Sequence, residues 1–208
     1  MLTQKLLAIT NLGADWVLWL LVGLSIVSVG IMIERAFYYI GRRMSNLDAV
    51  ANQLLAGDLA GARQAVQGRV GMEADVVRAA VENAVRGPDT VAEVVNGQLE
   101  RARLDYEQRL AFLGTLGNNA PFIGLFGTVL GVIRAFADLA AHPSSGGAGT
   151  VMAGISDALI ATAVGLFVAL PAVVMFNLYQ RWIRRATQRS TALGHAAVAF
   201  LKSRPQGS

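Results

Sequence analysis

Residues 120–136, "APFIGLFGTVLGVIRAF", and residues 154–179, "GISDALIATAVGLFVALPAVVMFNLY", decide how this chain folds. Both stretches are apolar and rich in glycine, and each has a threonine near its middle, Thr128 and Thr162. Glycine and threonine are less favourable than alanine inside a helix. In lipid, however, helices associate through close packing and interhelical hydrogen bonds, so small residues are favoured where two helices meet. The two stretches therefore predict a pair of membrane-spanning helices that pack closely.

The composition of the whole chain indicates a membrane protein. Hydrophobic residues make up 54% of its 208 residues and charged residues only 15%, whereas a soluble domain carries about a quarter charged residues. Charges are nearly absent from three windows, residues 16–33, 112–133 and 157–179. At about 1.5 Å per residue, each window can cross a hydrocarbon core roughly 30 Å thick. We predict an all-α membrane protein with three transmembrane helices.

The basic character of the chain does not require nucleic acid. Its net charge is +4 and its pI is near 10.0, but the arginines lie mainly in residues 35–109 and 181–204, which flank the apolar windows. This is the distribution that the positive-inside rule expects, so we predict contact with membrane lipid and no nucleic-acid partner. The first window has no A-x-A-like cleavage site and leads directly into Glu34 and Arg35, which is typical of a retained anchor.

The arginines also predict the topology. Residues 34–109 contain ten arginines, while residues 138–154 contain no lysine or arginine. The N-terminus and residues 138–154 should therefore face the outer side of the membrane and the basic segments the cytoplasm. The predicted segments are an outer N-terminus (1–15), transmembrane helix 1 (16–33), a cytoplasmic helical region (34–111), transmembrane helix 2 (112–137), a periplasmic loop (138–154), transmembrane helix 3 (155–179), and a cytoplasmic C-terminal helix and tail (180–208).

Two further structural expectations come from the residues around the apolar windows. No proline interrupts the sequence between Pro88 and Asn118, so we expect one long helix to run from the cytoplasm into the membrane. Aromatic residues at or just past the inner ends of the windows, Tyr38, Tyr39, Tyr179 and Trp182, predict an aromatic belt at the inner interface.

Small residues recur at helical spacing along the second and third windows. The residues that we expect to form helix-packing faces are Gly124, Gly127, Gly131, Ala158, Gly165 and Ala169. Two interpretations of the central threonines remain open. Each hydroxyl could simply bond back to its own helix. Alternatively, Thr128 and Thr162 could line a narrow polar path, because a hydroxyl can donate and accept hydrogen bonds without carrying a charge.

Asp157 is the one charged residue in the third window. An ionisable side chain costs about 2.5–3.5 kcal/mol at the bilayer centre and suggests function by default. Asp157 could therefore take part in a polar or proton path. It could equally cap the N-terminus of the third transmembrane helix, where the helix dipole favours an acidic side chain.

Two prolines interrupt the apolar windows. Pro121 and Pro171 each remove a backbone N–H and predict helix kinks. Asn118 and Asn119 stand just before Pro121 at the inner end of the second window, where they could re-satisfy a freed carbonyl or hold water.

Catalytic motifs are missing from the sequence. The chain has no cysteine, and its two histidines, His142 and His195, lie far from any pair of carboxylates with ligand spacing. Phosphate loops, dinucleotide fingerprints and H-E-x-x-H are also missing. We therefore predict neither an enzyme nor a metal site, and no catalytic residue is assigned.

The two opening stretches strongly resemble the second and third spans of the ExbB/TolQ/MotA proton-channel family. The resemblance covers the outer N-terminus, the cytoplasmic helical insert and the two linked spans. It implies a ring of subunits, as a pentamer, around two copies of a single-span ExbD/TolR/MotB-like partner that carries the titrating aspartate. It also implies that Thr128 and Thr162 line the pore beside that aspartate. The family usually has glutamate where this chain has Asp157, and the shorter side chain puts a proton-relay role in doubt.

The resemblance implies a stator subunit that uses the proton motive force, with protons as the coupling ion and no cofactor. A TonB/TolA-like protein would then receive the work for outer-membrane transport or envelope processes. The short cytoplasmic insert and modest outer loop favour an ExbB/TolQ-like role over a flagellar one, although a gliding or flagellar-type stator stays open. The alternative from another class is a non-conducting membrane scaffold, in which the small residues serve assembly alone.

Overall fold

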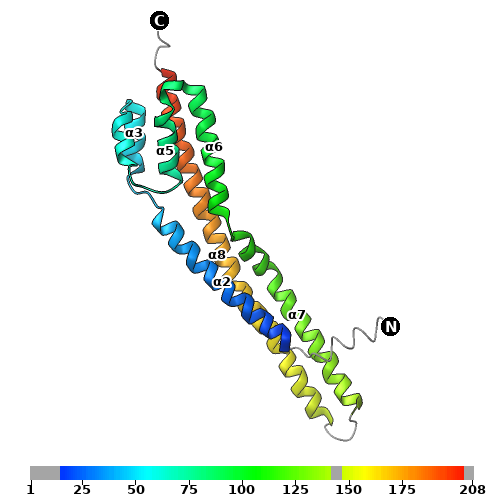
Figure 1. Ribbon diagram of the computed structural model, residues 1–208. Helices are drawn as coiled ribbons and strands as arrows, with labels where there is room; N and C mark the ends of the chain where they lie inside the picture. The colour runs from blue at the N-terminus through cyan, green and yellow to red at the C-terminus, as the bar shows by residue number, and fades with distance from the viewer. Residues whose placement is uncertain (1–14, 142–146, 204–208) are drawn as a thin grey trace. The chain divides into compact units, whose positions relative to one another are not determined.

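The computed structural model describes residues 15–141 and 147–203. Their elements, in chain order (Figure 1), are α2 (Asp15–Gly41), α3 (Leu47–Ala56), α4 (Leu59–Ala65), α5 (Met72–Glu82), the short 3-10 helix η1 (Ala84–Arg86), α6 (Pro88–Glu107), α7 (Leu110–Ala141) and α8 (Gly147–Ser203). These described residues contain no β-strand, which confirms the predicted all-α fold. His142 and most of the predicted outer N-terminus lie outside the described residues.

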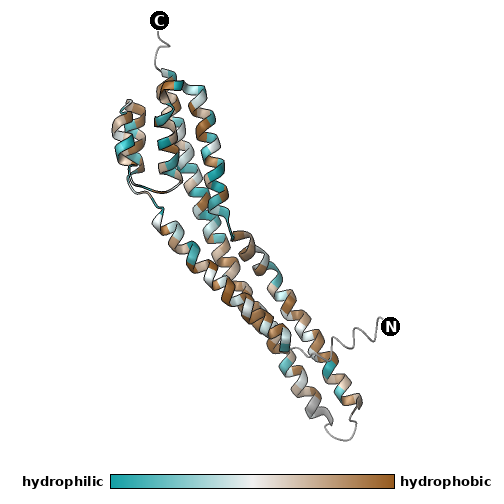
Figure 2. Cartoon of the chain, in the orientation of Figure 1, coloured by the Kyte–Doolittle hydropathy of each residue, from teal (hydrophilic) through white to brown (hydrophobic). Residues whose placement is uncertain are grey.

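Three helices are long and apolar enough to cross a membrane, namely Asp15–Gly41, Leu110–Ala141 and the Val151–Ser203 part of α8. Their best 18-residue windows have mean hydropathies of 2.4, 1.7 and 2.5, and at most 28% of each window is buried inside the chain. Hydrophobic residues accordingly predominate along α2, α7 and the first half of α8 (Figure 2). Apolar surface that protein does not cover must be covered by lipid or by other subunits. The chain is a membrane protein with three candidate transmembrane helices.

Helical structure extends into the segment that the sequence predicted as a periplasmic loop. Helix α7 continues to Ala141 and α8 begins at Gly147, so residues 138–141 and 147–154 are helical. The expectation of a loop over all of 138–154 was therefore wrong for these residues. Glycine in the first turn of α8 is tolerated because the N–H groups of a first turn have no partner within the helix.

The chain divides into two compact units. We call residues Met1–Ile33 and Arg109–Asn177 the span unit, and residues Glu34–Gln108 and Leu178–Ser208 the bundle unit. Helices α2 and α8 each contribute residues to both units, whereas α7 lies in the span unit and α3 to α6 lie in the bundle unit. The boundary at residues 33 and 34 coincides with the end of the first apolar window, and that at 177 and 178 lies two residues before the end of the third.

The core of the span unit is small and combines three helices. Its buried residues come from α2, α7 and α8, and they are Val17, Leu21, Leu116, Ala120, Leu130, Val168, Ala169 and Ala172. Val17 and Leu21 have no exposed surface although they belong to the N-terminal helix. Helix α2 is therefore packed against the other two spans of the same chain.

The bundle unit has a larger core built from branched aliphatic residues. Helices α3, α5, α6 and α8 supply most of the fully buried side chains, including Val50, Leu54, Val76, Val77, Val91 and Leu193. Gly194 of α8 lies against α6, since a Cβ on it would lie 2.6 Å from Cγ1 of Val95. Burial of each aliphatic side chain from water contributes about 1.5–3 kcal/mol to the free energy of unfolding. Burial of apolar side chains is therefore what stabilises this unit.

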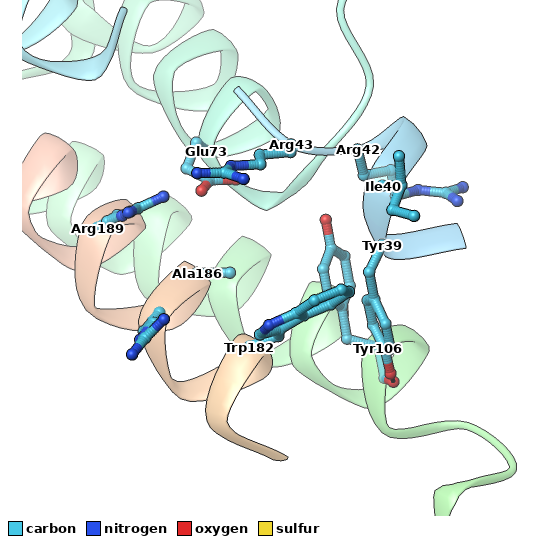
Figure 3. A pocket seen from close by; sticks show the side chains of 10 residues that line it. Tyr39, Ile40, Arg42, Arg43, Glu73, Tyr106, Trp182, Ala186 and Arg189 are labelled. Atoms are coloured by element: carbon cyan, nitrogen blue, oxygen red, sulfur yellow. Dashed lines mark hydrogen bonds between the residues drawn. The ribbon is translucent and has the colours of Figure 1, made fainter. Parts of the chain in front are cut away.

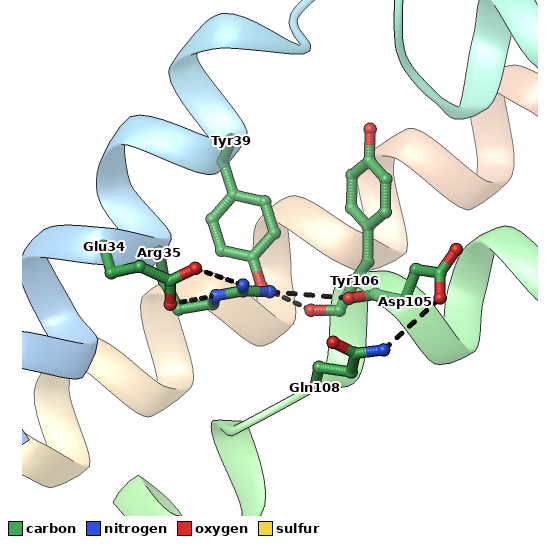
Figure 4. A network of polar contacts seen from close by, with 6 residues as sticks. All are labelled: Glu34, Arg35, Tyr39, Asp105, Tyr106 and Gln108. Carbon is green, nitrogen blue, oxygen red and sulfur yellow. Dashed lines mark hydrogen bonds and ion pairs between the residues drawn. The ribbon is translucent and has the colours of Figure 1, made fainter.

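The long helix expected from Pro88 to Asn118 is broken, and that prediction was wrong. Helix α6 ends at Glu107, Arg109 has a positive φ of 63°, and α7 begins at Leu110. In an unbroken helix the carbonyls of Asp105 and Tyr106 would accept from the N–H groups of residues 109 and 110. Instead, Arg35 Nη1 donates to the Asp105 carbonyl at 3.4 Å and the Tyr39 hydroxyl donates to the Tyr106 carbonyl at 2.6 Å (Figure 4).

This break depends on side chains about 70 residues away in the sequence. The Arg35 guanidinium, only 4% exposed, is also paired with Glu34. A buried charge that is paired and hydrogen-bonded is tolerated, whereas an unpaired one is costly. No local signal in the sequence around Gln108 could have shown that α2 supplies these partners.

The predicted aromatic belt at the inner interface is wrong for two of its members. Tyr39 and Tyr179 are 6% and 0% exposed, and their ring centroids lie 5.2 Å apart inside the bundle unit. Tyr106 joins this cluster, with its ring centroid 5.7 Å from that of Tyr39. The rings therefore pack within the protein, where aromatic pairs contribute to stability beyond their buried area.

Candidate functional site

Helices α7 and α8 meet backbone to backbone at two buried glycines. A Cβ built on Gly124 would lie 2.6 Å from the carbonyl oxygen of Ala161, and one built on Gly165 would lie 2.6 Å from the carbonyl oxygen of Ala120. Real Cβ atoms essentially never approach another atom within 3.0 Å. Only glycine fits at these two positions, so the two small-residue stripes lie against each other.

The other small residues of the stripes surround this contact. A Cβ on Gly127 would lie 2.8 Å from Cβ of Ala161 and 3.1 Å from Cγ1 of Val17, so Gly127 lies where α2, α7 and α8 meet. Ala158 and Ala169 are buried, with 1% and 5% of their surface exposed, while Gly131 is half-buried.

The two threonines lie one helical turn from the glycines and face each other. Their hydroxyl oxygens are in hydrogen-bonding contact. Thr128 Oγ1 is also 3.2 Å from the carbonyl oxygen of Ala158 on α8 and 3.3 Å from the carbonyl oxygen of Gly124 on its own helix. Because the Thr128 hydroxyl has one proton, it donates either to the carbonyl of its own helix or to that of α8, or shares the proton between them.

The hydroxyl pair has two alternative hydrogen-bond arrangements, because each hydroxyl carries one proton and two lone pairs. When Thr128 donates to a carbonyl, Thr162 donates to Thr128 and the oxygen of Thr162 can accept from a third group. When Thr128 donates to Thr162, the proton of Thr162 can be donated to a third group. Both threonines are half-buried, so a third group can reach them. The pair can thus serve either a donor or an acceptor without acquiring charge.

Asp157 does not cap a helix, and that interpretation was wrong. Helix α8 begins at Gly147, so Asp157 lies well inside it, where the backbone N–H groups already have intrahelical partners. Its side chain is exposed in the single chain. Arg134 of α7 lies 3.9 Å from Asp138, measured between Nε and Oδ2, and both side chains are about half exposed.

The prolines and asparagines of the second window lie within α7. Pro121 removes the N–H that would bond to the Gly117 carbonyl. Asn119 Nδ2 donates at 2.7 Å to the Thr115 carbonyl, which is not the carbonyl that Pro121 frees. Asn118 and Asn119 are both exposed. Pro171 likewise lies inside α8, with its ring exposed. The kinks expected at the two prolines stay predictions.

Sequence reasoning missed the contribution of α2 to this site. Val17 contacts the Gly127 position, and Val17, Leu21 and Ser28 are buried on one face of α2. The signal for this face is their spacing of four and seven residues, which fits a helix. The sequence alone did not single out this face, because α2 is apolar on nearly all sides. Such a helix gives no contrast between a packed side and a lipid-facing side.

The described residues thus define a class of protein: a helical membrane protein with three candidate spans, a hydroxyl pair between two closely packed spans, and a separate helical bundle unit. The chain belongs to the MotA/TolQ/ExbB proton channel family. The family model matches residues 69–192, which is more than half of the chain and includes all of α7 and the hydroxyl pair.

Individual relatives agree with this assignment. The chain is 44% identical over 89 residues to the Tol-Pal system protein TolQ of Pseudomonas aeruginosa, which covers 43% of this chain and 38% of the relative. It is 43% identical over 95 residues to the biopolymer transport protein ExbB of Salmonella typhimurium, covering 45% and 37%. A putative ExbB-like biopolymer transport protein of Helicobacter pylori is 42% identical over 91 residues, covering 42% and 59%. The matches thus span less than two thirds of the length of these relatives.

Proposed function

We propose that this chain is the proton-channel or stator subunit of a bacterial inner-membrane motor that is driven by the proton motive force. Its family is described as a proton channel family, and similar proteins carry the names TolQ and ExbB. These names favour energy transfer to envelope or outer-membrane processes over flagellar or gliding motility. Protons are the coupling ion in this proposal, and a TonB/TolA-like protein receives the work.

The observation that carries the proposal is the hydroxyl contact between Thr128 and Thr162 in the middle of two spans. A proton path needs a group that takes up and releases protons, yet Asp157 is the one carboxylate in the apolar windows of this chain. By the resemblance to the ExbB/TolQ/MotA family, we assign the titrating carboxylate to a single-span ExbD/TolR-like partner, two copies of which lie inside a pentameric ring of this chain.

The two arrangements of the hydroxyl pair suit such a carboxylate in both of its protonation states. A protonated carboxyl group donates a hydrogen bond, which the oxygen of Thr162 accepts. An ionised carboxylate only accepts, and Thr162 then donates its proton while Thr128 donates to Thr162. Rotation of two hydroxyl groups thus replaces the solvation that the carboxylate loses in lipid, where an unsatisfied polar group costs several kcal/mol.

The membrane potential supplies the driving force. One proton that crosses the membrane releases about 2.3 kcal/mol per 100 mV. Alternate protonation of the two partner carboxylates would favour stepwise movement of the ring relative to the partner. In this arrangement the N-terminus faces the periplasm and the C-terminus the cytoplasm, as the arginine distribution predicts.

Thr128→Val and Thr162→Val test the proposal, because valine keeps the shape of threonine and removes the hydroxyl. Each variant should reduce proton flux at least about tenfold in vesicles that contain the chain and its partner, since one lost hydrogen bond to a charged group costs about 1.5–3 kcal/mol. Thr187→Val is the matched control, because Thr187 bonds to the Ile183 carbonyl of its own helix in the bundle unit.

Oligomer size, measured by native mass spectrometry, should be the same in all three variants. Unchanged proton flux in both Thr128→Val and Thr162→Val would contradict the proton path and favour the scaffold function. Equal loss of flux in Thr187→Val would show that the effect is not specific to the hydroxyl pair.

A further inference from the structure

The bundle unit contains a cavity that the proposed function does not use. Its volume is about 210 Å³, and it is lined by residues of α2, α5, α6 and α8 and by the segment just after α2. A single water needs only about 10–15 Å³ of such space, so the cavity can hold a group of several heavy atoms. All of its lining residues belong to the bundle unit.

Arginine side chains dominate the charge of this cavity. Arg42 and Arg43 approach it from the end of α2, and Arg185 and Arg189 from α8. Glu73 of α5 is the one carboxylate among the lining residues. The cavity therefore has an excess of positive charge, and guanidinium groups bind phosphate through paired N–H donors.

Aromatic rings line one side of the cavity, while Arg43, Arg185 and Arg189 are exposed and Arg42 is half-buried. The rings of Tyr39, Tyr106 and Trp182 form one side of the cavity, and Figure 3 shows Glu73 on the other side, near Arg43 and Arg189. Tyr39 and Tyr106 are each only 6% exposed. This wall limits the number of water molecules that can solvate an anion in the cavity, and a partly desolvated charge interacts more strongly with its partners.

One arginine is already held in place. The guanidinium carbon of Arg42 lies 3.6 Å from the centroid of the Tyr38 ring, which is cation–π geometry. A stacked guanidinium keeps its N–H groups in the plane of the group, where they can donate to an anion. Less side-chain entropy is then lost on binding.

The position of the cavity along the chain indicates where its ligand comes from. Arg42 and Arg43 come soon after the end of the first apolar window, and Arg185 and Arg189 come soon after the end of the third. Ile40, which also lines the cavity, is 64% exposed. Phe37, one turn earlier on α2, is 73% exposed. Exposed apolar side chains beside basic residues, just past the end of an apolar window, are typical of the interface between a membrane and its lipid headgroups. Basic pockets at that interface bind anionic headgroups.

We propose that this cavity is a binding site for a phosphate group, with the headgroup of an anionic phospholipid as its source. Arg185 and Arg189 bind the phosphate from α8, Arg42 and Arg43 bind it from the end of α2, and Ile40 and Trp182 contact the glycerol part of the lipid. The carboxylate of Glu73 offsets part of the positive charge of the four arginines. This site is independent of the proton path in the span unit.

The test compares two double variants of the full chain in detergent. Arg185→Gln with Arg189→Gln removes two charges from the cavity. Arg181→Gln with Arg184→Gln removes two charges from exposed positions of the same helix that do not line it. Each protein is equilibrated with mixed micelles that contain phosphatidylglycerol or phosphatidylcholine, and the retained lipid is counted by native mass spectrometry. Circular dichroism and thermal melting verify that all variants are folded.

The unmodified chain should retain phosphatidylglycerol in preference to phosphatidylcholine. The cavity variant should lose at least about tenfold in retention, because two charge-assisted hydrogen bonds are lost, while the control variant keeps it. Equal losses in the two double variants would overturn the proposal, since they would indicate a general effect of positive charge. Absence of any preference for the anionic lipid, together with no binding of phosphate, would overturn it as well.

A second measurement distinguishes the lipid from free phosphate. Phosphorus NMR of the lipid-depleted protein with inorganic phosphate should show little line broadening if the lipid is the ligand. Broadening that disappears in the cavity variant alone would support the phosphate site and assign free phosphate as its source. Glu73→Gln removes the one negative charge of the cavity and should increase retention of the anion, whereas unchanged or weaker retention would contradict the proposal.

Discussion

The span unit and the bundle unit hold their helices together in different ways. In the span unit, α7 and α8 approach so closely at Gly124 and Gly165 that neither position has room for a Cβ, and a hydroxyl pair lies beside this contact. In the bundle unit, valine and leucine side chains fill the space between helices. Water drives apolar side chains together, but lipid does not, so the span unit depends on close backbone contact and hydrogen bonds. The two units of the same chain thus follow two different packing rules.

The largest effect should follow from a cavity in the bundle core. Leu54→Ala removes a side chain with no exposed surface and should lower the free energy of unfolding by about 2–5 kcal/mol. Leu55→Ala is the control, because the adjacent leucine is 54% exposed. Chemical denaturation followed by circular dichroism measures both. Equal effects of the two substitutions would contradict the view that burial of aliphatic side chains stabilises this unit.

A smaller effect should follow from one added methyl group in the span unit. Gly124→Ala places a Cβ 2.6 Å from a backbone oxygen and should destabilise the packing of α7 against α8 by about 1–3 kcal/mol. Gly30→Ala is the matched control on α2, where a Cβ would meet nothing within 4 Å. Thermal melting of the detergent-solubilised protein compares them. If Gly30→Ala were the more harmful of the two, close contact at Gly124 would not be what holds these helices.

The smallest effect concerns a buried charge in the bundle unit. Glu73 is 4% exposed, and its burial raises the pKa of the carboxyl group, with the Arg189 charge acting in the opposite direction. Because the pKa is higher in the folded state than in the unfolded chain, the folded state holds the proton more tightly. Stability should therefore fall as the pH rises from the ordinary glutamate value of 4.5 through the raised pKa.

Glu73→Gln removes this titration, so the pH dependence of the variant should be flatter over the same range and its stability at neutral pH higher. Melting temperatures of both proteins between pH 4 and pH 8 give the comparison. A steeper fall in the variant than in the unmodified chain would show that Glu73 stabilises the bundle in its ionised form.

The sequence predicted those parts of the fold that depend on local composition. The three apolar windows gave the three candidate transmembrane helices, and the small residues at helical spacing placed Gly124, Gly165 and the two threonines on facing stripes. The α6–α7 break could not be predicted, because the groups that end α6, Arg35 and Tyr39, belong to a helix about 70 residues earlier. The same holds for the face of α2 that packs on Gly127, since a helix that is apolar all round hides its packed side.

Asp157 illustrates the same limit at a single residue. A cap was a reasonable expectation for an acidic residue three positions after a glycine, but the helix begins earlier, at Gly147. Helix ends are poorly specified by sequence, because a first turn makes few hydrogen bonds and small differences in propensity decide its position.

The sequence by itself determined that this chain is an all-α membrane protein with three spans and determined which residues of those spans are small. These properties follow from hydropathy and helical periodicity, which each segment carries alone. Only the tertiary structure decided that Thr128 and Thr162 share a hydrogen bond, that α2 side chains end α6, and that four arginines from two distant segments surround one cavity. Each of these is a contact between residues far apart in the chain, and its geometry is fixed only when the helices pack.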